Sequence, residues 1–191
     1  MEISTFIFLA IVAALVIYFI ILYNNLVTLK HNVTQAWANI DVLLKQRHDE
    51  LPKLVEVCKQ YMNYEQETME KVMRARSAVA SAREKGDVNA VGQAEAQLRM
   101  GLGNLFALAE AYPDLKADQS FQHLQSRITG LENSIADRRE FYNAAVNINN
   151  IRIEQFPDVI VARKFNFKPA ELLVFNEEEK QDVDVKSLFA T

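Results

Sequence analysis

The sequence predicts an all-α protein, in which an N-terminal transmembrane helix continues into an antiparallel bundle of about four long helices, followed by an extended C-terminal tail. Three observations lead to this prediction. Residues 6–22 are all apolar, and no charged residue occurs between Ile3 and Leu29. After this stretch, apolar residues recur at intervals of three and four, which is typical of one face of an α-helix. Only five Gly and four Pro occur in 191 residues, so few positions interrupt a helix.

The first element is a membrane anchor, expected over residues 1–25, with residues 3–29 in contact with the bilayer. At about 1.5 Å per residue, roughly 20 apolar residues cross a hydrocarbon core of ~30 Å. The alternative is a cleaved signal peptide, but Met1-Glu2 carries no basic side chain and no small-residue cleavage site follows the apolar run. Lys30 follows the span, which favours an external N-terminus and a cytoplasmic C-terminal domain.

The helical bundle is expected over residues 26–157, and its first helix is expected to be continuous with the anchor. The apolar stripe of that helix, over residues 26–62, includes Trp37, which we expect to anchor the core. Pro52 lacks a backbone N–H and its ring clashes with the preceding turn. It therefore predicts a kink or a short break near residues 48–51.

Three further helices complete the predicted bundle, over about residues 64–84, 88–111 and 120–155. Gly86 is expected to end the first of these, and Asp87 to cap the start of the next. Pro113 should end the third bundle helix, because the residue before a proline is biased away from the α conformation. Leu115 is then expected to fold back onto the bundle. The pair Phe156-Pro157 should close the last helix.

After residue 157 the character of the sequence changes. Residues 158–175 carry bulky, partly β-branched side chains without helical periodicity, which predicts an extended segment packed on the bundle, with at most a short strand. Residues 176–191 are expected to form an acidic, solvated tail.

Composition argues against nucleic-acid binding, because the net charge is −4 and no basic face is evident. Cys58 is the only cysteine, so no intrachain disulfide forms, and its place on an apolar stripe predicts a small buried side chain. The three histidines form no metal-ligand motif, and no phosphate-binding glycine loop is present. We therefore expect no catalytic residue, no cofactor and no metal.

Polar residues on apolar stripes are the remaining candidates for a site. Arg47 lies on the stripe of the first bundle helix, and Arg138, Tyr142 and Asn149 lie on that of the last. A buried arginine needs a carboxylate partner, and a buried asparagine needs hydrogen bonds. Two interpretations stay open: these residues fix the register of the helices, or they line a polar pocket or a partner-binding notch.

Several motifs resemble those of the LemA family of bacterial membrane proteins. They are YNNLV at 23–27, AWANIDV at 36–42, LKQR at 44–47, LPKLV at 51–55, LFALAEAYPDLKA at 105–117, YNAAV at 142–146 and FP at 156–157. The resemblance implies a single N-terminal span in the bacterial plasma (inner) membrane, with the N-terminus outside and a mostly helical cytoplasmic domain. It implies no established enzyme activity. Family members are often encoded beside membrane zinc proteases of the HtpX type, which makes such a protease an expected partner.

The sequence as a whole thus predicts a non-enzymatic, membrane-anchored scaffold or adaptor that forms a homo-oligomer and organises a membrane protein. The first bundle helix is longer than the second and third, so residues 26–33 are expected to keep apolar surface for another subunit. One alternative is an enzyme or ligand-binding bundle with a polar site around Arg47, Arg138 and Asn149. Another is a membrane-surface module, which a contiguous Lys/Arg face near the bilayer would favour.

Overall fold

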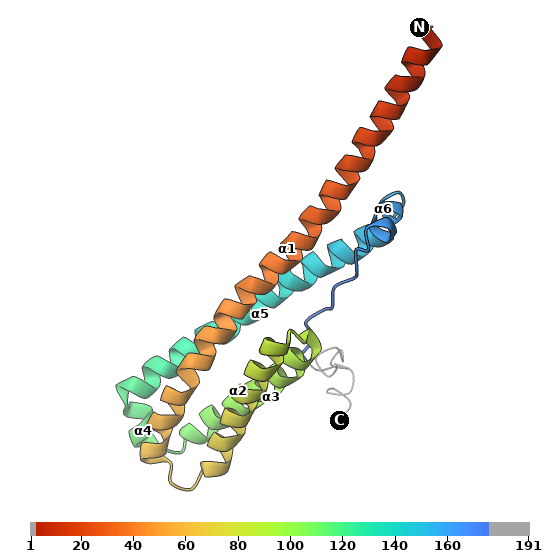
Figure 1. The fold of residues 1–191 in the computed structure, drawn as a ribbon. Coiled ribbons are helices and arrows are strands. Elements are labelled where there is room, and N and C mark those ends of the chain that lie inside the picture. Colours follow the sequence, from red (N-terminus) through yellow and green to blue (C-terminus); the bar gives the residue numbers. More distant parts are fainter. Residues whose placement is uncertain (1–2, 176–191) are drawn as a thin grey trace, which may run out of the picture. The chain divides into compact units, whose positions relative to one another are not determined.

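The computed structural model describes residues 3–175, and their regular secondary structure is entirely α-helical (Figure 1). The helices are α1 (Ile3–Tyr61), α2 (Gln66–Lys85), α3 (Val88–Ala109), α4 (Pro113–Ala117), α5 (Gln119–Glu154) and α6 (Asp158–Lys164). The predicted all-α class is confirmed. Among the described residues, one helix, α1, contains a stretch that is long and apolar enough to cross a membrane.

The described residues divide into two compact units. The first unit contains residues 3–40 and 138–172, and the second unit contains residues 41–137 and 173–175. Helices α1 and α5 therefore each contribute to both units. The range 26–157, treated above as one bundle, is shared between them.

Pro52 lies inside α1, and of the predicted kink or break the break does not occur, because the helix continues through Pro52 to Tyr61. A proline has no N–H to donate to the carbonyl four residues earlier, which here belongs to His48. Arg76 of α2 supplies the missing donor, since its Nε lies 2.8 Å from the His48 carbonyl oxygen. The local sequence around Pro52 carries no sign of this contact, because the donor comes from another helix.

We expect Arg76→Met to lower the free energy of unfolding of the second unit by about 1–3 kcal/mol, because it leaves the His48 carbonyl without a donor. In a Pro52→Ala background the same substitution should cost clearly less, because the restored N–H can bond that carbonyl within α1. Chemical denaturation followed by circular dichroism measures both effects. Equal losses in the two backgrounds would show that Arg76 does not compensate for the proline.

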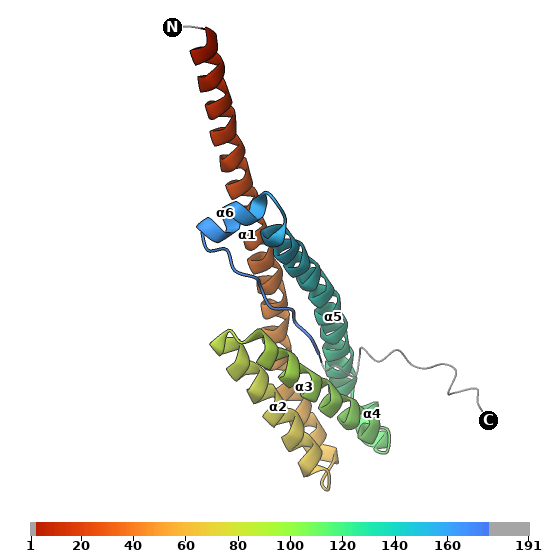
Figure 2. The same cartoon turned by 90° about the vertical axis from the view of Figure 1, so that its right-hand side faces the viewer.

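Helices α2 and α3 form an antiparallel hairpin in the second unit (Figures 1 and 2). Gly86 ends α2 with a left-handed φ of 67°. The Asp87 carboxylate accepts a 2.9 Å hydrogen bond from the Ala90 N–H and so caps α3. Both predictions for this turn are confirmed. Gly101 lets the two helices approach closely, since a Cβ there would lie 3.3 Å from the Val72 side chain.

The core of the second unit draws side chains from the end of α1 and from α2, α3, α4 and the start of α5. Its most deeply buried members include Leu51, Leu54, Cys58, Met62, Val72, Leu98, Leu105, Leu115, Phe121 and Ile128. Helix α3 ends at Ala109, and Pro113 begins α4 at a position where its missing N–H is not needed. This short helix turns Leu115 into the core.

Residues 173–175 lie against α3, and both Leu173 and Phe175 are buried. The approach is close because Gly92 has no side chain. A Cβ at Gly92 would lie 2.2 Å from the carbonyl oxygen of Val174. Any side chain at position 92 would therefore displace residues 173–175.

In the first unit, α6 packs against the point where α1 becomes buried. The side chains of residues 3–21 are exposed, whereas Leu22 and Leu26 pack in a cluster with Val161 and Ala162 of α6. Leu26 has no exposed surface, so the expectation that residues 26–33 offer bare apolar surface is wrong at this position.

Helix α6 also corrects the prediction that residues 158–164 are extended. The β-branched run Val159-Ile160-Val161 favours a strand on its own. Packing of Val161 on α1 overrides this preference. The Asp158 carboxylate, in the first turn of α6, accepts a 2.9 Å hydrogen bond from Arg152 Nε, and an acidic residue at this end suits the helix dipole.

Trp37 is half-buried in the first unit, which is less than expected for a core anchor. Its ring packs against that of Tyr142, with centroids 5.4 Å apart.

Candidate functional site

A buried ion cluster forms around Arg47 in the second unit. Arg47 is 1% exposed and donates from Nη2 to Glu95 of α3 and from Nη1 to Glu132 of α5. Glu95 is 3% exposed and Glu132 is 18% exposed. One guanidinium from α1 thus joins two other helices.

The charges of this cluster depend on one another. Burial alone would lower the pKa of Arg47, but the attraction of Glu95 and Glu132 outweighs it and raises that pKa. Burial raises the pKa of Glu95, and the nearby carboxylate of Glu132 adds to the effect although Arg47 opposes it. Burial therefore makes Glu95 easier to protonate than an exposed glutamate.

Arg47 has both of its carboxylate partners on neighbouring helices, so the two ion pairs link α1 to α3 and to α5. This arrangement suits the interpretation in which Arg47 fixes the helix register. Arg47 Nε is buried and donates to no described residue.

Arg138 is exposed, rather than on the core-facing side of α5. Its guanidinium carbon lies 5.7 Å from the centroid of the Phe141 ring. A step of three along the helix leads from the buried Ile135 to Arg138, but the next buried residue of α5 after Ile135 is Tyr142. In this turn of α5, Arg139 is half-buried, whereas Arg138 is exposed.

Tyr142 and Asn149 lie in the first unit and face the chain that follows α6. The Tyr142 hydroxyl donates to the carbonyl of Glu171 over 2.8 Å, and burial raises the pKa of Tyr142, which keeps it a donor. Asn149 is 4% exposed and donates to the side-chain oxygen of Asn150. Asn150 in turn pairs with the Ala170 backbone, through two hydrogen bonds of 2.9 Å. The hydrogen bonds from Tyr142 and Asn150 hold residues 170–171 against α5.

Sequence reasoning missed Glu95 and Glu132. For Glu95 a signal existed, because it lies on the buried stripe of α3 between Ala94 and Leu98. A carboxylate on an apolar stripe requires a buried cation.

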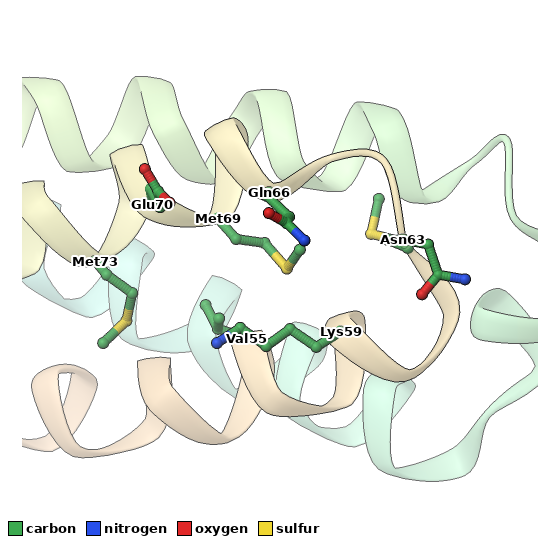
Figure 3. Close-up of a pocket in the computed structure, with 8 residues that line it drawn as sticks. Val55, Lys59, Asn63, Gln66, Met69, Glu70 and Met73 are labelled. Carbon is green, nitrogen blue, oxygen red and sulfur yellow. The ribbon is translucent and has the colours of Figure 1, made fainter.

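A cavity of about 560 Å³ opens in the second unit between the end of α1 and the start of α2 (Figure 3). Its lining is Val55, Lys59, Met62, Asn63, Gln66, Met69, Glu70 and Met73. Methionine side chains adapt to irregular apolar groups. The cavity can therefore accept an apolar group beside the exposed charges of Lys59 and Glu70.

Cys58 is fully buried in the core of the second unit, and burial raises the pKa of its thiol to about 11. We expect no alkylation by a maleimide or iodoacetamide at pH 8 while the protein is folded, because the thiol is neutral and inaccessible. Stoichiometric alkylation should appear in denaturant. Rapid labelling under native conditions would contradict the packing described here, whereas protection makes Cys58 a probe of the second unit's unfolding.

Two curated proteins are similar to this chain over most of its length. Magnetosome protein MamQ 2 of Paramagnetospirillum magneticum is 25% identical over 186 residues, which cover 85% of this chain and 68% of the relative. Protein LemA of Metamycoplasma hominis is 28% identical over 167 residues, covering 86% of this chain and 74% of the relative. Neither name describes an enzymatic reaction.

These relatives and the apolar stretch of α1 support an association with membranes. The sequence pattern of the LemA family matches residues 36–187, which is most of the chain. The chain therefore belongs to the LemA family.

Proposed function

We propose that this protein is a membrane-anchored helical scaffold that self-associates and organises a membrane protein partner. In this proposal the apolar N-terminal part of α1 spans the bacterial plasma (inner) membrane with its N-terminus outside, and the helical domain that follows is cytoplasmic. The observation that carries the proposal is an apolar seam on α5, which consists of Phe141, Ala144, Ile148 and Ile151.

All four side chains of the seam are exposed, and Phe141, Ile148 and Ile151 are more than half exposed. Their spacing of three, four and three residues is that of the a and d positions of a coiled coil. Such spacing presents one apolar line to a partner helix. Scattered exposed apolar residues need no explanation, but a line at this spacing favours an interaction surface.

A second copy of the same chain is the occupant that we propose for the seam. Membrane anchors hold all copies parallel in one plane, and parallel helices are the arrangement in which equivalent a and d residues meet. In a two-fold dimer of this kind, Ile148 of one protomer lies close to Ile148 of its partner.

Disulfide crosslinking of the full chain in native membranes tests this proposal. Ile148→Cys should give a covalent dimer on mild oxidation, whereas Thr129→Cys, at an exposed position of α5 outside the seam, should not. The natural Cys58 does not interfere because it is buried. Equal crosslinking at both positions, or none at Ile148→Cys, would contradict a dimer through the seam.

The orientation is tested with Ser77→Cys, at an exposed position of the second unit. A membrane-impermeant maleimide should label it only after the cells are permeabilised, and labelling in intact cells would reverse the proposed orientation. For the partner, the proposal includes a protease of the HtpX type. Co-purification of such a protease with the native chain, lost on Ile148→Glu and kept on Thr129→Glu, would support that part.

A further inference from the structure

A second cavity, of about 510 Å³, lies in the first unit between α1 and the chain that follows α6. It is lined by Tyr23, Val27, Lys30, His31, Asn149, Phe165, Asn166, Phe167 and Lys168.

One wall of this cavity is aromatic. The Tyr23 ring lies 4.8 Å from that of Phe165 and 5.9 Å from that of Phe167, measured between centroids. The turn between the two phenylalanines is fixed by Asn166, which has a left-handed φ of 56°. The Phe167 N–H donates to the carbonyl of Ala162 over 2.9 Å, so the turn closes α6 as a Schellman motif. The wall is thus a built part of the fold.

The polar lining is cationic. Lys30 and Lys168 contribute ammonium groups, and His31 and Asn149 add side chains that can donate hydrogen bonds. None of the described residues that line the cavity is acidic. Within residues 3–175, neither Lys30 nor Lys168 takes part in an ion pair. Such a lining suits a phosphate group.

The position of the cavity indicates where that phosphate comes from. Leu22 ends the apolar run of α1 and packs in one cluster with α6, so α6 lies at the boundary of the span. Tyr23, the next residue, is of a type enriched at the membrane–water interface. Phe156 and Ile160, just before and within α6, are exposed and can enter the same interface.

We propose that this cavity binds the phosphate headgroup of an anionic membrane lipid, with Lys30 and Lys168 as its charge partners and the aromatic wall beside its glycerol and upper acyl chains. The proposal rests on the membrane anchor proposed above. Such a site would make the first unit bind anionic lipids selectively, in addition to connecting the membrane span to the second unit.

Native mass spectrometry of the full chain tests the proposal. The protein is exchanged into a mild detergent containing equal amounts of phosphatidylglycerol and phosphatidylcholine with identical acyl chains. We expect selective retention of one phosphatidylglycerol. A basic residue near an anionic lipid contributes about 1 kcal/mol, so Lys30→Gln with Lys168→Gln should weaken this retention roughly 25-fold, about fivefold per lysine. The matched control, Lys45→Gln with Lys85→Gln, removes two exposed charges elsewhere and should retain the lipid as the natural chain does.

Three outcomes would overturn the proposal. They are equal retention of both lipids, an equal loss in both double variants, and displacement of the lipid by millimolar inorganic phosphate, which would make free phosphate the ligand. Flotation with vesicles of phosphatidylcholine alone tests the anchor separately. A chain that floats there but shows no lipid preference keeps its anchor and loses the headgroup site, whereas a chain that does not float loses the anchor itself.

Discussion

Arg47→Met should destabilise the second unit by about 3–5 kcal/mol, because it leaves the buried Glu95 carboxylate without its cation. Glu132 is less buried and can turn toward solvent, so Glu95 bears most of the loss. The measurement is the denaturant dependence of Cys58 alkylation in the full chain. Loss of less than about 1 kcal/mol would mean that Arg47 contributes little to holding the three helices together.

Glu95→Gln is the matched control. It keeps a hydrogen-bond acceptor for Arg47 and removes the cost of ionising a buried carboxyl, so it should destabilise clearly less than Arg47→Met. The double variant Arg47→Met with Glu95→Leu should recover much of the loss, because an apolar pair then replaces an unpaired charge.

The free energy of unfolding of the Arg47→Met variant should increase as the pH is lowered from 7. The pKa of Glu95 in the folded protein lies above its ordinary value of 4.5, so the folded state binds a proton more tightly than the unfolded state. The stability contributed by this group is complete below 4.5 and is lost as the pH rises through the folded pKa. Without Arg47 the pKa should rise further, and the variant should regain stability on acidification from pH 7 by more than the natural chain does.

Gly92→Ala is expected to have the second large effect, because its Cβ cannot coexist with the Val174 carbonyl oxygen. Residues 173–175 must then move away from α3. Exposure of Leu173 and Phe175 costs about 1.5–3 kcal/mol each. Alanine recovers about 1 kcal/mol through its higher helix propensity. We therefore expect a net loss of about 2–5 kcal/mol, with new proteolytic cleavage next to residue 173.

Gly103→Ala serves as the control for the Gly92 substitution. It lies on the same helix, and a Cβ there meets nothing within 4 Å. The higher helix propensity of alanine then acts without any steric clash, and the free energy of unfolding should rise by up to about 1 kcal/mol. If both alanine variants were equally stable, the contact between α3 and residues 173–175 would not contribute to folding.

Local signals in the sequence predicted most of the helices. The Gly86-Asp87 turn and the boundary at Pro113 each depend on a few adjacent residues, and the structure has both where they were expected. The helix α6 was missed because its residues favour a strand locally and become helical by packing on α1, which is more than a hundred residues earlier.

The candidate site was harder to predict than the fold. The place of Arg47 on a stripe indicated that it needs a carboxylate, but the chain contains 25 acidic residues, and a single sequence does not show which of them meet it. Arg138 was misplaced for a different reason. Alternating steps of three and four give a repeat of 3.5 residues, whereas an α-helix has about 3.6 residues per turn. The predicted stripe therefore rotates slowly away from the buried face of the helix. This rotation placed Arg138 on the stripe, although Arg139 is the residue nearer the core.

The contact between Arg76 and the His48 carbonyl also constrains how this sequence could have evolved. Proline at position 52 costs less in a chain that has a donor at position 76, because that donor bonds the carbonyl the proline leaves unpaired. A chain that acquires the arginine first therefore avoids the cost of an unpaired carbonyl. Once the proline was fixed, the arginine could no longer be lost without cost. Relatives that carry the proline should keep a long donor at the second position, and relatives that lack it should vary there freely.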